Sequence, residues 1–246
     1  MTEPGGSPAK RGVEIWRGPR EDLARRAAER IAAALAERLR AAPTAVLGLV
    51  GGRSVGGIYR ELRGGALAWE RVHIFLADER LVPPGSAESN ERLIRDELTQ
   101  PLVAAGRLPP DNFHPFPLGT EAPERAAAHY GAELARLGGR FDAGLLSAGE
   151  DGHVASLFPG RTWTDGRGGS FVIVADAPKP PPRRVSASAD LLERTSLGLV
   201  AFFGAGKRDA LARFLDPSVP RALCPAKLAC AMGEAVALVD EAGPEA

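Results

Sequence analysis

The stretch Ala45–Gly52, AVLGLVGG, decides the expected fold. Its first six residues are apolar without interruption, and two glycines end the run. A short run of this kind is typical of a strand buried on both faces of a parallel sheet. Ile58–Leu62 (IYREL) then begins a helical segment, so this part of the chain has the strand, turn and helix order of an α/β protein.

The same alternation continues along the chain. Further apolar runs end in polar or glycine-bearing turns at Val72–Ala77, Phe141–Leu146, Phe171–Ala175 and Leu197–Phe203. Apolar residues at helical spacing mark Glu21–Arg40, Ser89–Ala105, Glu124–Leu137 and Lys207–Leu215. The pattern predicts a Rossmann-like, three-layer α/β fold with a mainly parallel central sheet. No change in composition marks a boundary, so we expect one domain over residues 13–246, preceded by a flexible segment over residues 1–12.

Composition excludes several classes of function. The 246 residues carry 31 Lys+Arg and 31 Asp+Glu, so no uniformly basic surface is available to bind nucleic acid. No apolar run is long enough to span a membrane, and no signal-peptide pattern begins the sequence. Cys224 and Cys230 match neither a disulfide framework nor a zinc spacing. We therefore expect a cytoplasmic protein without a metal, a nucleic-acid partner or a membrane partner.

The turn Gly51–Ser54 (GGRS) is a candidate anion-binding loop. Gly51 and Gly52 permit backbone conformations that expose N–H groups, and the next helix adds its positive end. Arg53 adds a charge and Ser54 a hydroxyl. A tight strand-to-helix turn explains the glycines equally well. The turn has neither the lysine of a Walker loop nor the third glycine of a dinucleotide fingerprint, so no nucleotide is indicated.

Cationic residues follow the other predicted strands. Asp78-Glu79-Arg80 forms either a salt-bridged corner or a place where an arginine meets a phosphate. Arg184, beside Arg183, comes after Phe171–Ala175, and Lys207 comes after the next strand. The carboxyl ends of parallel strands meet at one edge of a sheet. We therefore expect these cations, with Arg53, to form a pocket for a small anionic substrate such as a phosphate ester.

The sharpest candidate for catalysis is Ser147–Pro159 (SAGEDGHVASLFP). His153 lies here in a glycine-rich loop after a predicted strand, and Asp151 comes two residues earlier. Imidazole has an ordinary pKa of about 6.5, so it can accept and return a proton at neutral pH. A lone histidine is more often structural, but loops after strands collect active residues. We therefore expect His153 to be a catalytic base that Asp151 orients.

Five motifs, in this order, resemble those of the 6-phosphogluconolactonases, within the glucosamine-6-phosphate isomerase/6-phosphogluconolactonase family. They are GGRS at Gly51–Ser54, DERLVPPGSAESN at Asp78–Asn90, EDGHVASLFPG at Glu150–Gly160, APKPPPRRVSAS at Ala177–Ser188 and GAGK at Gly204–Lys207. The resemblance extends from about Glu14 to Glu241 and is therefore not limited to one turn.

The resemblance implies a single α/β domain that hydrolyses 6-phospho-D-glucono-1,5-lactone to 6-phospho-D-gluconate, in the oxidative branch of the pentose phosphate pathway. It implies no metal or organic cofactor. We expect a monomer or small homo-oligomer whose partner is a small sugar phosphate. His153 would be the base, assisted by Asp151. The implied substrate- and phosphate-binding residues are Gly51, Gly52, Arg53, Ser54, Asp78, Arg80, Asn90, Gly152, Arg184 and Lys207.

The chain also departs from the pattern of this family. Ser147 stands where a glycine is usual, Val154 replaces a threonine, and Val50 replaces a serine, which removes a possible hydroxyl contact. Ser89 and Asn90 are good caps for the helix that follows, and capping alone would explain them.

Three alternatives remain. A sugar-phosphate deaminase or isomerase on the same fold would usually have tyrosine at Arg80 and asparagine at Asp151. A protein that binds a sugar phosphate without turnover would keep the same cations. A nucleophilic serine is disfavoured because Ser156 lies outside any Gly-x-Ser-x-Gly elbow.

Overall fold

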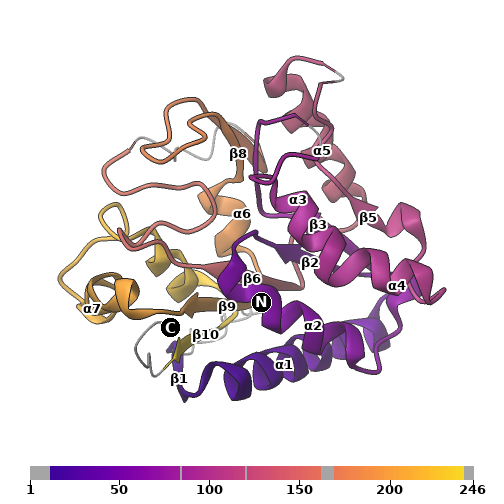
Figure 1. Ribbon diagram of the computed structural model, residues 1–246, viewed down its shortest axis with the longest axis horizontal. Helices are drawn as coiled ribbons and strands as arrows, with labels where there is room; N and C mark the ends of the chain where they lie inside the picture. Colours follow the sequence, from indigo (N-terminus) through magenta and orange to yellow (C-terminus); the bar gives the residue numbers. More distant parts are fainter. Residues whose placement is uncertain (1–11, 84, 120, 162–168, 241–246) are drawn as a thin grey trace, which may run out of the picture.

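The computed structural model describes residues 12–83, 85–119, 121–161 and 169–240, so nearly all of the expected flexible segment at residues 1–12 lies outside the described residues. Seven parallel strands form the central sheet, in the order β1-β10-β9-β6-β2-β3-β5 (Figure 1). They are β1 (Glu14–Gly18), β2 (Ala45–Leu49), β3 (Val72–Leu76), β5 (Phe113–His114), β6 (Ala143–Ser147), β9 (Leu197–Phe202) and β10 (Glu234–Asp240). The predicted α/β fold with a mainly parallel sheet is confirmed.

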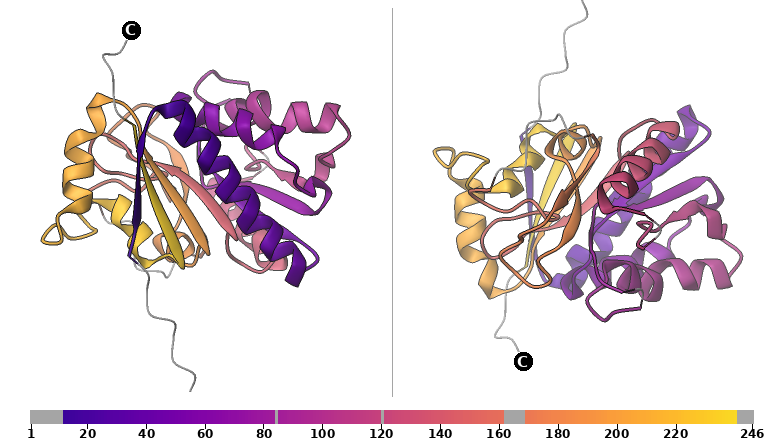
Figure 2. Two further views of the ribbon diagram at one scale, coloured as in Figure 1. Left: turned by 90° about the horizontal axis from the view of Figure 1, so that it is seen from below. Right: turned by 90° about the horizontal axis from the view of Figure 1, so that it is seen from above.

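Helices cover both faces of this sheet (Figure 2). They are α1 (Arg20–Ala41), α2 (Gly56–Gly64), α3 (Asn90–Ile94), α4 (Gln100–Ala104), α5 (Pro123–Arg136), α6 (Ala189–Glu193) and α7 (Arg208–Leu215), with a π-helical turn, Arg95–Thr99, between α3 and α4. Helices α1 to α4 pack on one face, and α5, α6 and α7 pack on the other. Three layers result.

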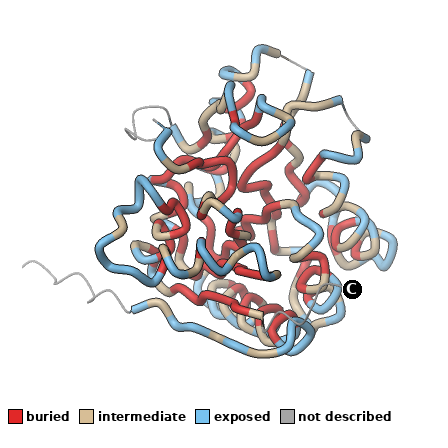
Figure 3. Tube along the Cα trace, turned by 60° about the vertical axis from the view of Figure 1, so that its left-hand side comes forward, coloured by how far each residue is buried: buried red, intermediate tan, exposed pale blue. Residues whose placement is uncertain are grey.

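The alternation of side chains along a strand explains why β2 is apolar throughout. Leu47 and Leu49 point to the face that α1 and α2 cover, whereas Val46 contributes to the core under α5. Figure 3 shows the consequence, because the buried parts of the trace gather inside the molecule. The apolar stripe of α1, with Leu23, Ile31 and Leu35 all fully buried, was predicted from its helical spacing.

A second, three-stranded antiparallel sheet stands beside the carboxyl edge of the first. It contains β4 (Asp78–Arg80), β8 (Arg184–Ala187) and β7 (Phe171–Val174), in the order β4-β8-β7. The prediction that Phe171–Ala175 belongs to the parallel sheet was therefore wrong. The chain returns from β7 to β8 through the proline turn alone, which is too short for the crossover that parallel pairing requires.

Three strands of the central sheet were not predicted: β1, β10 and the two-residue β5. Strand β10 (EAVALVD) pairs with both β9 and β1, and five of its seven residues are buried. Strand β1 (EIWRG) forms the edge, where Ile15 is 41 % exposed. Its five mostly exposed residues give no periodic signal, so only the pairing with β10 defines it.

Substituting Gly48 by alanine tests the packing between β2 and the segment before β6. A Cβ atom at residue 48 would lie 2.6 Å from the ring of Phe141, which is 1 % exposed. We expect Gly48→Ala to lower the free energy of unfolding by about 1–3 kcal/mol, because the ring has no space to move. Urea denaturation measures the change.

Gly131→Ala in α5 is the matched control. A Cβ atom there meets no atom closer than 3.5 Å, and alanine favours a helix over glycine by about 0.5–1 kcal/mol. Its free energy of unfolding should therefore be unchanged or higher. Equal losses in the two variants would show that Phe141 does not limit the space at β2.

Candidate active site

A pocket of about 220 Å³ lies at the carboxyl edge of the central sheet. The turns after β2, β6 and β9 meet there with β4 and the turn before β8. Its lining comprises Val50, Gly51, Gly52, Ser54, Asp78, Arg80, Asn90, Ser147, Ala148, Gly149, His153, Ala155, Lys179, Arg184 and Lys207. The turns that the sequence singled out therefore come together in one place.

Three residues expected at the site do not line this pocket. Arg53 is exposed and outside the lining, so it does not join the other cations. Gly152 is buried behind the histidine loop, where a Cβ atom would lie 3.0 Å from Cys224 Sγ. Asp151 lies behind His153 and meets the pocket only through that residue.

The glycine turn is shaped by close packing and by an unusual backbone conformation. A Cβ atom at Gly51 would lie 1.8 Å from Asn90 Oδ1, and Gly52 has a φ of 114°. Both positions therefore require glycine, as a tight turn would. The turn also presents ligand-binding groups, since Ser54 Oγ faces the pocket 3.5 Å from Ser147 Oγ. Among the described residues, no hydrogen bond takes up the N–H of Gly51 or Gly52.

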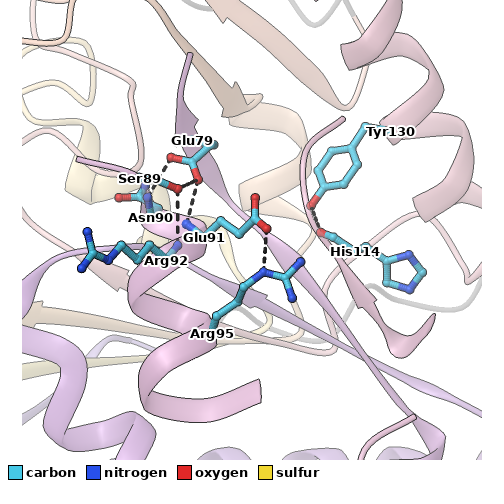
Figure 4. Close-up of polar contacts among 8 residues, drawn as sticks. All are labelled: Glu79, Ser89, Asn90, Glu91, Arg92, Arg95, His114 and Tyr130. Atoms are coloured by element: carbon cyan, nitrogen blue, oxygen red, sulfur yellow. Dashed lines mark hydrogen bonds and ion pairs between the residues drawn. The ribbon is translucent and has the colours of Figure 1, made fainter. Parts of the chain in front are cut away.

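Glu79 is a fully buried carboxylate that joins β4 to the start of α3 (Figure 4). Oε1 accepts hydrogen bonds from the backbone N–H groups of Arg80, at 2.6 Å, and Asn90, at 2.8 Å. Oε2 accepts from Ser89 Oγ at 2.9 Å and from the N–H of Glu91 at 2.7 Å. Burial raises the pKa of Glu79 above its ordinary value, although these hydrogen bonds oppose the shift. The sequence did not predict this role for Glu79.

Asp78 and Asn90, both expected to bind substrate, are tied to each other. Asn90 Nδ2 donates to the backbone oxygen and to Oδ1 of Asp78, at 2.9 Å in both cases. Ser156 is buried, and its Oγ donates a hydrogen bond to Asp78 Oδ2 at 2.8 Å. The predicted capping role of Ser89 is confirmed, because its Oγ accepts from the N–H of Arg92. Asn90 instead begins the helix, and its side chain binds Asp78.

His153 and Asp151 form the predicted pair. His153 Nδ1 lies 2.5 Å from Asp151 Oδ1. Burial raises the pKa of the Asp151 carboxyl, but the hydrogen bond and the charge of His153 lower it by more than burial raises it. The pKa of Asp151 is therefore well below its ordinary value. An ionised carboxylate only accepts hydrogen bonds, so Nδ1 donates its proton to Asp151, and Nε2 carries the lone pair whenever the ring is neutral. Among the described residues, none is hydrogen-bonded to Nε2.

The loop around His153 leaves little space for variation. A Cβ atom at Gly149 would lie 2.0 Å from His153 Nδ1, so a side chain there would displace the ring. The ring also packs 4.5 Å from that of Phe158, measured between centroids. Ala155, which lines the pocket, has a φ of 49°, a conformation that costs an alanine about 1–2 kcal/mol. The side chain of His153 is 15 % exposed, and its position is therefore well defined.

Arg80, Arg184 and Lys207 line the pocket, as expected for its positive charge. Arg80 Nη1 donates to Glu88 O at 2.6 Å, and its buried Nε has no hydrogen-bond partner among the described residues. Burial lowers the pKa of Lys207, and so does the charge of Lys179. Burial and the charge of Arg80 likewise lower the pKa of Arg184. The cations are thus close enough to repel one another, which favours an anion between them.

Two departures from the family pattern have different consequences. Val50 lines the pocket, where a serine would have offered a hydroxyl. Val154 is fully buried in the core and does not line the pocket. Ser147 adds a hydroxyl at the end of β6.

Two further properties concern the described residues only. No helix in them combines the length and the apolar character needed to cross a membrane. Within the same ranges, no group of three or more His, Cys, Asp or Glu side chains is arranged to hold a metal ion.

These features define an α/β protein with a small cationic pocket and a histidine–carboxylate pair at the carboxyl edge of its sheet. Residues 18–238 match the model of the family described as glucosamine-6-phosphate isomerases/6-phosphogluconolactonase, and the chain belongs to this family. It is 32 % identical over 227 residues to the 6-phosphogluconolactonase of Mycobacterium leprae, an alignment that covers 87 % of this chain and 90 % of the relative.

Solved structures agree on the fold. The crystal structure of 6-phosphogluconolactonase from Thermotoga maritima is similar with a TM-score of 0.79 at 26 % identity, over 93 % of this chain and 100 % of the other. A monomeric glucosamine-6-phosphate deaminase is similar with a TM-score of 0.77 at 19 % identity, over 93 % of this chain and 98 % of the other. The fold alone therefore does not separate the two activities.

Glu79→Gln tests the buried carboxylate that holds β4 against α3. Glutamine keeps the size of the side chain, but its NH₂ group replaces one carboxylate oxygen. An NH₂ group cannot accept the hydrogen bonds that this oxygen accepts from N–H and O–H donors. We expect the free energy of unfolding at pH 7 to fall by about 1–3 kcal/mol, as for other buried groups that lose their partners. Urea denaturation measures this loss.

Glu70→Gln is the control for Glu79→Gln, since Glu70 is exposed. Its stability should stay within about 0.5 kcal/mol of the wild type. A Glu79→Gln protein as stable as this control would contradict the role of Glu79.

Proposed function

We propose that this chain hydrolyses 6-phospho-D-glucono-1,5-lactone to 6-phospho-D-gluconate. The observation that carries the proposal is the position of His153. Its Nδ1 is held by Asp151, and its ring lines a pocket that also contains Arg80, Arg184 and Lys207. The match to 6-phosphogluconolactonases over most of the chain supports the same activity.

In this proposal His153 acts as the general base. Nε2 takes a proton from a water molecule beside the lactone carbonyl, and the oxygen of that water attacks C1. Negative charge develops on the carbonyl oxygen, and backbone N–H groups or a nearby cation stabilise it. When the tetrahedral intermediate collapses, the bond from C1 to the ring oxygen breaks and the imidazolium returns its proton to that oxygen. Proton transfer of this kind typically contributes about 10²–10⁴-fold to the rate.

The cations that line the pocket would hold the phosphate of the substrate. Arg80 contributes charge from β4 and Lys207 from the turn after β9, and Gly51, Gly52 and Ser54 contribute N–H and hydroxyl donors. Binding at this end fixes the position of the lactone at the other, so that the water and C1 stay near His153. Asp151 remains ionised at neutral pH, because its pKa lies well below the ordinary value.

The surroundings of Asp78 argue against the deaminase and isomerase alternative. Those reactions move a proton at C2 of an open-chain sugar, for which a carboxylate base is well suited. Asp78 is the acidic residue in the lining, and both its carboxylate oxygens accept hydrogen bonds, from Asn90 and Ser156. It is 4 % exposed and so is held as part of the wall.

A substrate comparison with the wild-type protein tests the proposed function. Freshly generated 6-phosphogluconolactone should disappear faster than by spontaneous hydrolysis, whereas glucosamine 6-phosphate should release no ammonia. Ammonia release without lactone hydrolysis would replace the proposal by the deaminase. A melting shift with 6-phosphogluconate but no turnover of either compound would identify a protein that only binds a sugar phosphate.

Steady-state kinetics of Asp151→Asn and Arg80→Ala should separate catalysis from binding. The amide of asparagine cannot serve as a charged acceptor for Nδ1–H, so Asp151→Asn should lower kcat by at least about tenfold with little change in KM. Arg80→Ala should mainly raise KM, since it removes charge that holds the phosphate. Equal losses of kcat in both, with unchanged KM, would contradict these separate roles.

A further inference from the structure

Lys179 is a fourth cation in the lining of the pocket, and it comes from outside the central sheet. It lies on the turn between β7 and β8, which a hydrogen bond from the N–H of Ala177 to Pro182 O, at 2.9 Å, closes. Prolines stand on both sides of it, at Pro178 and Pro180, and they restrict the backbone of the turn. The backbone that carries Lys179 to the pocket is therefore conformationally restricted.

The buried guanidinium of Arg184 fixes the backbone at Lys179. Arg184 Nη2 donates to Lys179 O at 3.0 Å and to Pro180 O at 3.2 Å, while Nε donates to Pro181 O at 2.9 Å. Arg184 is 4 % exposed. Two of its nitrogens therefore bind the turn, and Lys179 is presented to the pocket from a defined position.

The side chain of Lys179 reaches across to the loop after β6. Lys179 Nζ lies 3.9 Å from Glu150 Oε2, and the two side chains are 43 % and 67 % exposed. An exposed ion pair of this kind contributes little, about 0–1 kcal/mol. The ammonium group can therefore exchange this partner for a phosphate, which offers more negative charge and more acceptor oxygens.

Lys207 lies near the same group. Burial and the charge of Lys179 lower the pKa of Lys207, whereas the charge of Glu150 raises it. The two ammonium groups thus come to the pocket from different parts of the fold, one from the turn between β7 and β8 and one from the turn after β9. A dianion between them would relieve their repulsion.

We propose that Lys179 binds the phosphate of the substrate together with Lys207, and that it leaves Glu150 when the phosphorylated ligand enters. The identity of the substrate rests on the proposed function, but the binding step requires only a phosphorylated ligand. Lys179 thereby determines the preference of the pocket for phosphorylated over unphosphorylated sugar acids.

Equilibrium binding of 6-phosphogluconate and of gluconate, measured by titration calorimetry, tests this proposal. Lys179→Gln should raise the Kd for 6-phosphogluconate by about ten- to hundredfold, the effect of losing one charged hydrogen-bond donor. Arg183→Gln removes the same charge from the residue directly before β8, which is exposed and does not line the pocket, and should change the Kd less than twofold. Gluconate binding should be equally weak in all these proteins.

Glu150→Gln should have the opposite effect. It removes the competing partner of Lys179, so the Kd for 6-phosphogluconate should fall below that of the wild type. Equal Kd values in Lys179→Gln and Arg183→Gln, or weaker binding by Glu150→Gln, would overturn the proposal.

Binding and turnover also separate this proposal from the proposed function. Binding that depends on Lys179 in a protein without lactonase activity would support the phosphate site and reject the reaction. Lactonase activity with an unchanged KM in Lys179→Gln would support the reaction and reject the phosphate site.

Discussion

The candidate site depends on the parallel pairing of three adjacent strands, β2, β6 and β9. Parallel strands place all their carboxyl ends at one edge, so three turns that are distant in the sequence meet there. The first brings the glycine turn, the second His153 and the third Lys207. The small antiparallel sheet then supplies the facing wall, with Arg80 and Arg184 side by side in register.

Charge is distributed unevenly in a chain whose formal net charge is zero. The two carboxylates of β4, Asp78 and Glu79, accept hydrogen bonds from backbone N–H groups and neutral side chains, which occupy their oxygens. Arg80, Arg184, Lys179 and Lys207 line the cavity. The carboxylates of Asp78 and Glu79 therefore have a structural role, and an excess of positive charge faces the space where an anionic substrate would bind.

The sequence predicted the central part of the fold and most of the pocket. Buried parallel strands are continuous apolar runs that end in glycine or a charge, and β2, β3 and β9 carry this signal clearly. The small sheet was missed because β7 and β8 are also short and partly apolar, and only their antiparallel pairing distinguishes them. At the site, proximity to a strand end did not reveal that Arg53 is exposed and lies outside the lining of the pocket.

Two functional assignments needed the three-dimensional structure. Lys179 gave no signal of its own, because it is a single lysine among prolines and its role follows from the contacts of Arg184 with the turn. Glu79 lies between two residues expected to bind substrate, and only its complete burial shows that it organises them.

The most direct test of the central claim measures the hydrolysis of freshly generated 6-phosphogluconolactone by the wild type and by His153→Ala, with 6-phosphogluconate detected through coupled NADPH formation. We predict acceleration above the spontaneous rate that is lost in a folded His153→Ala protein. Acceleration that survives the substitution would contradict the role of His153 as the base.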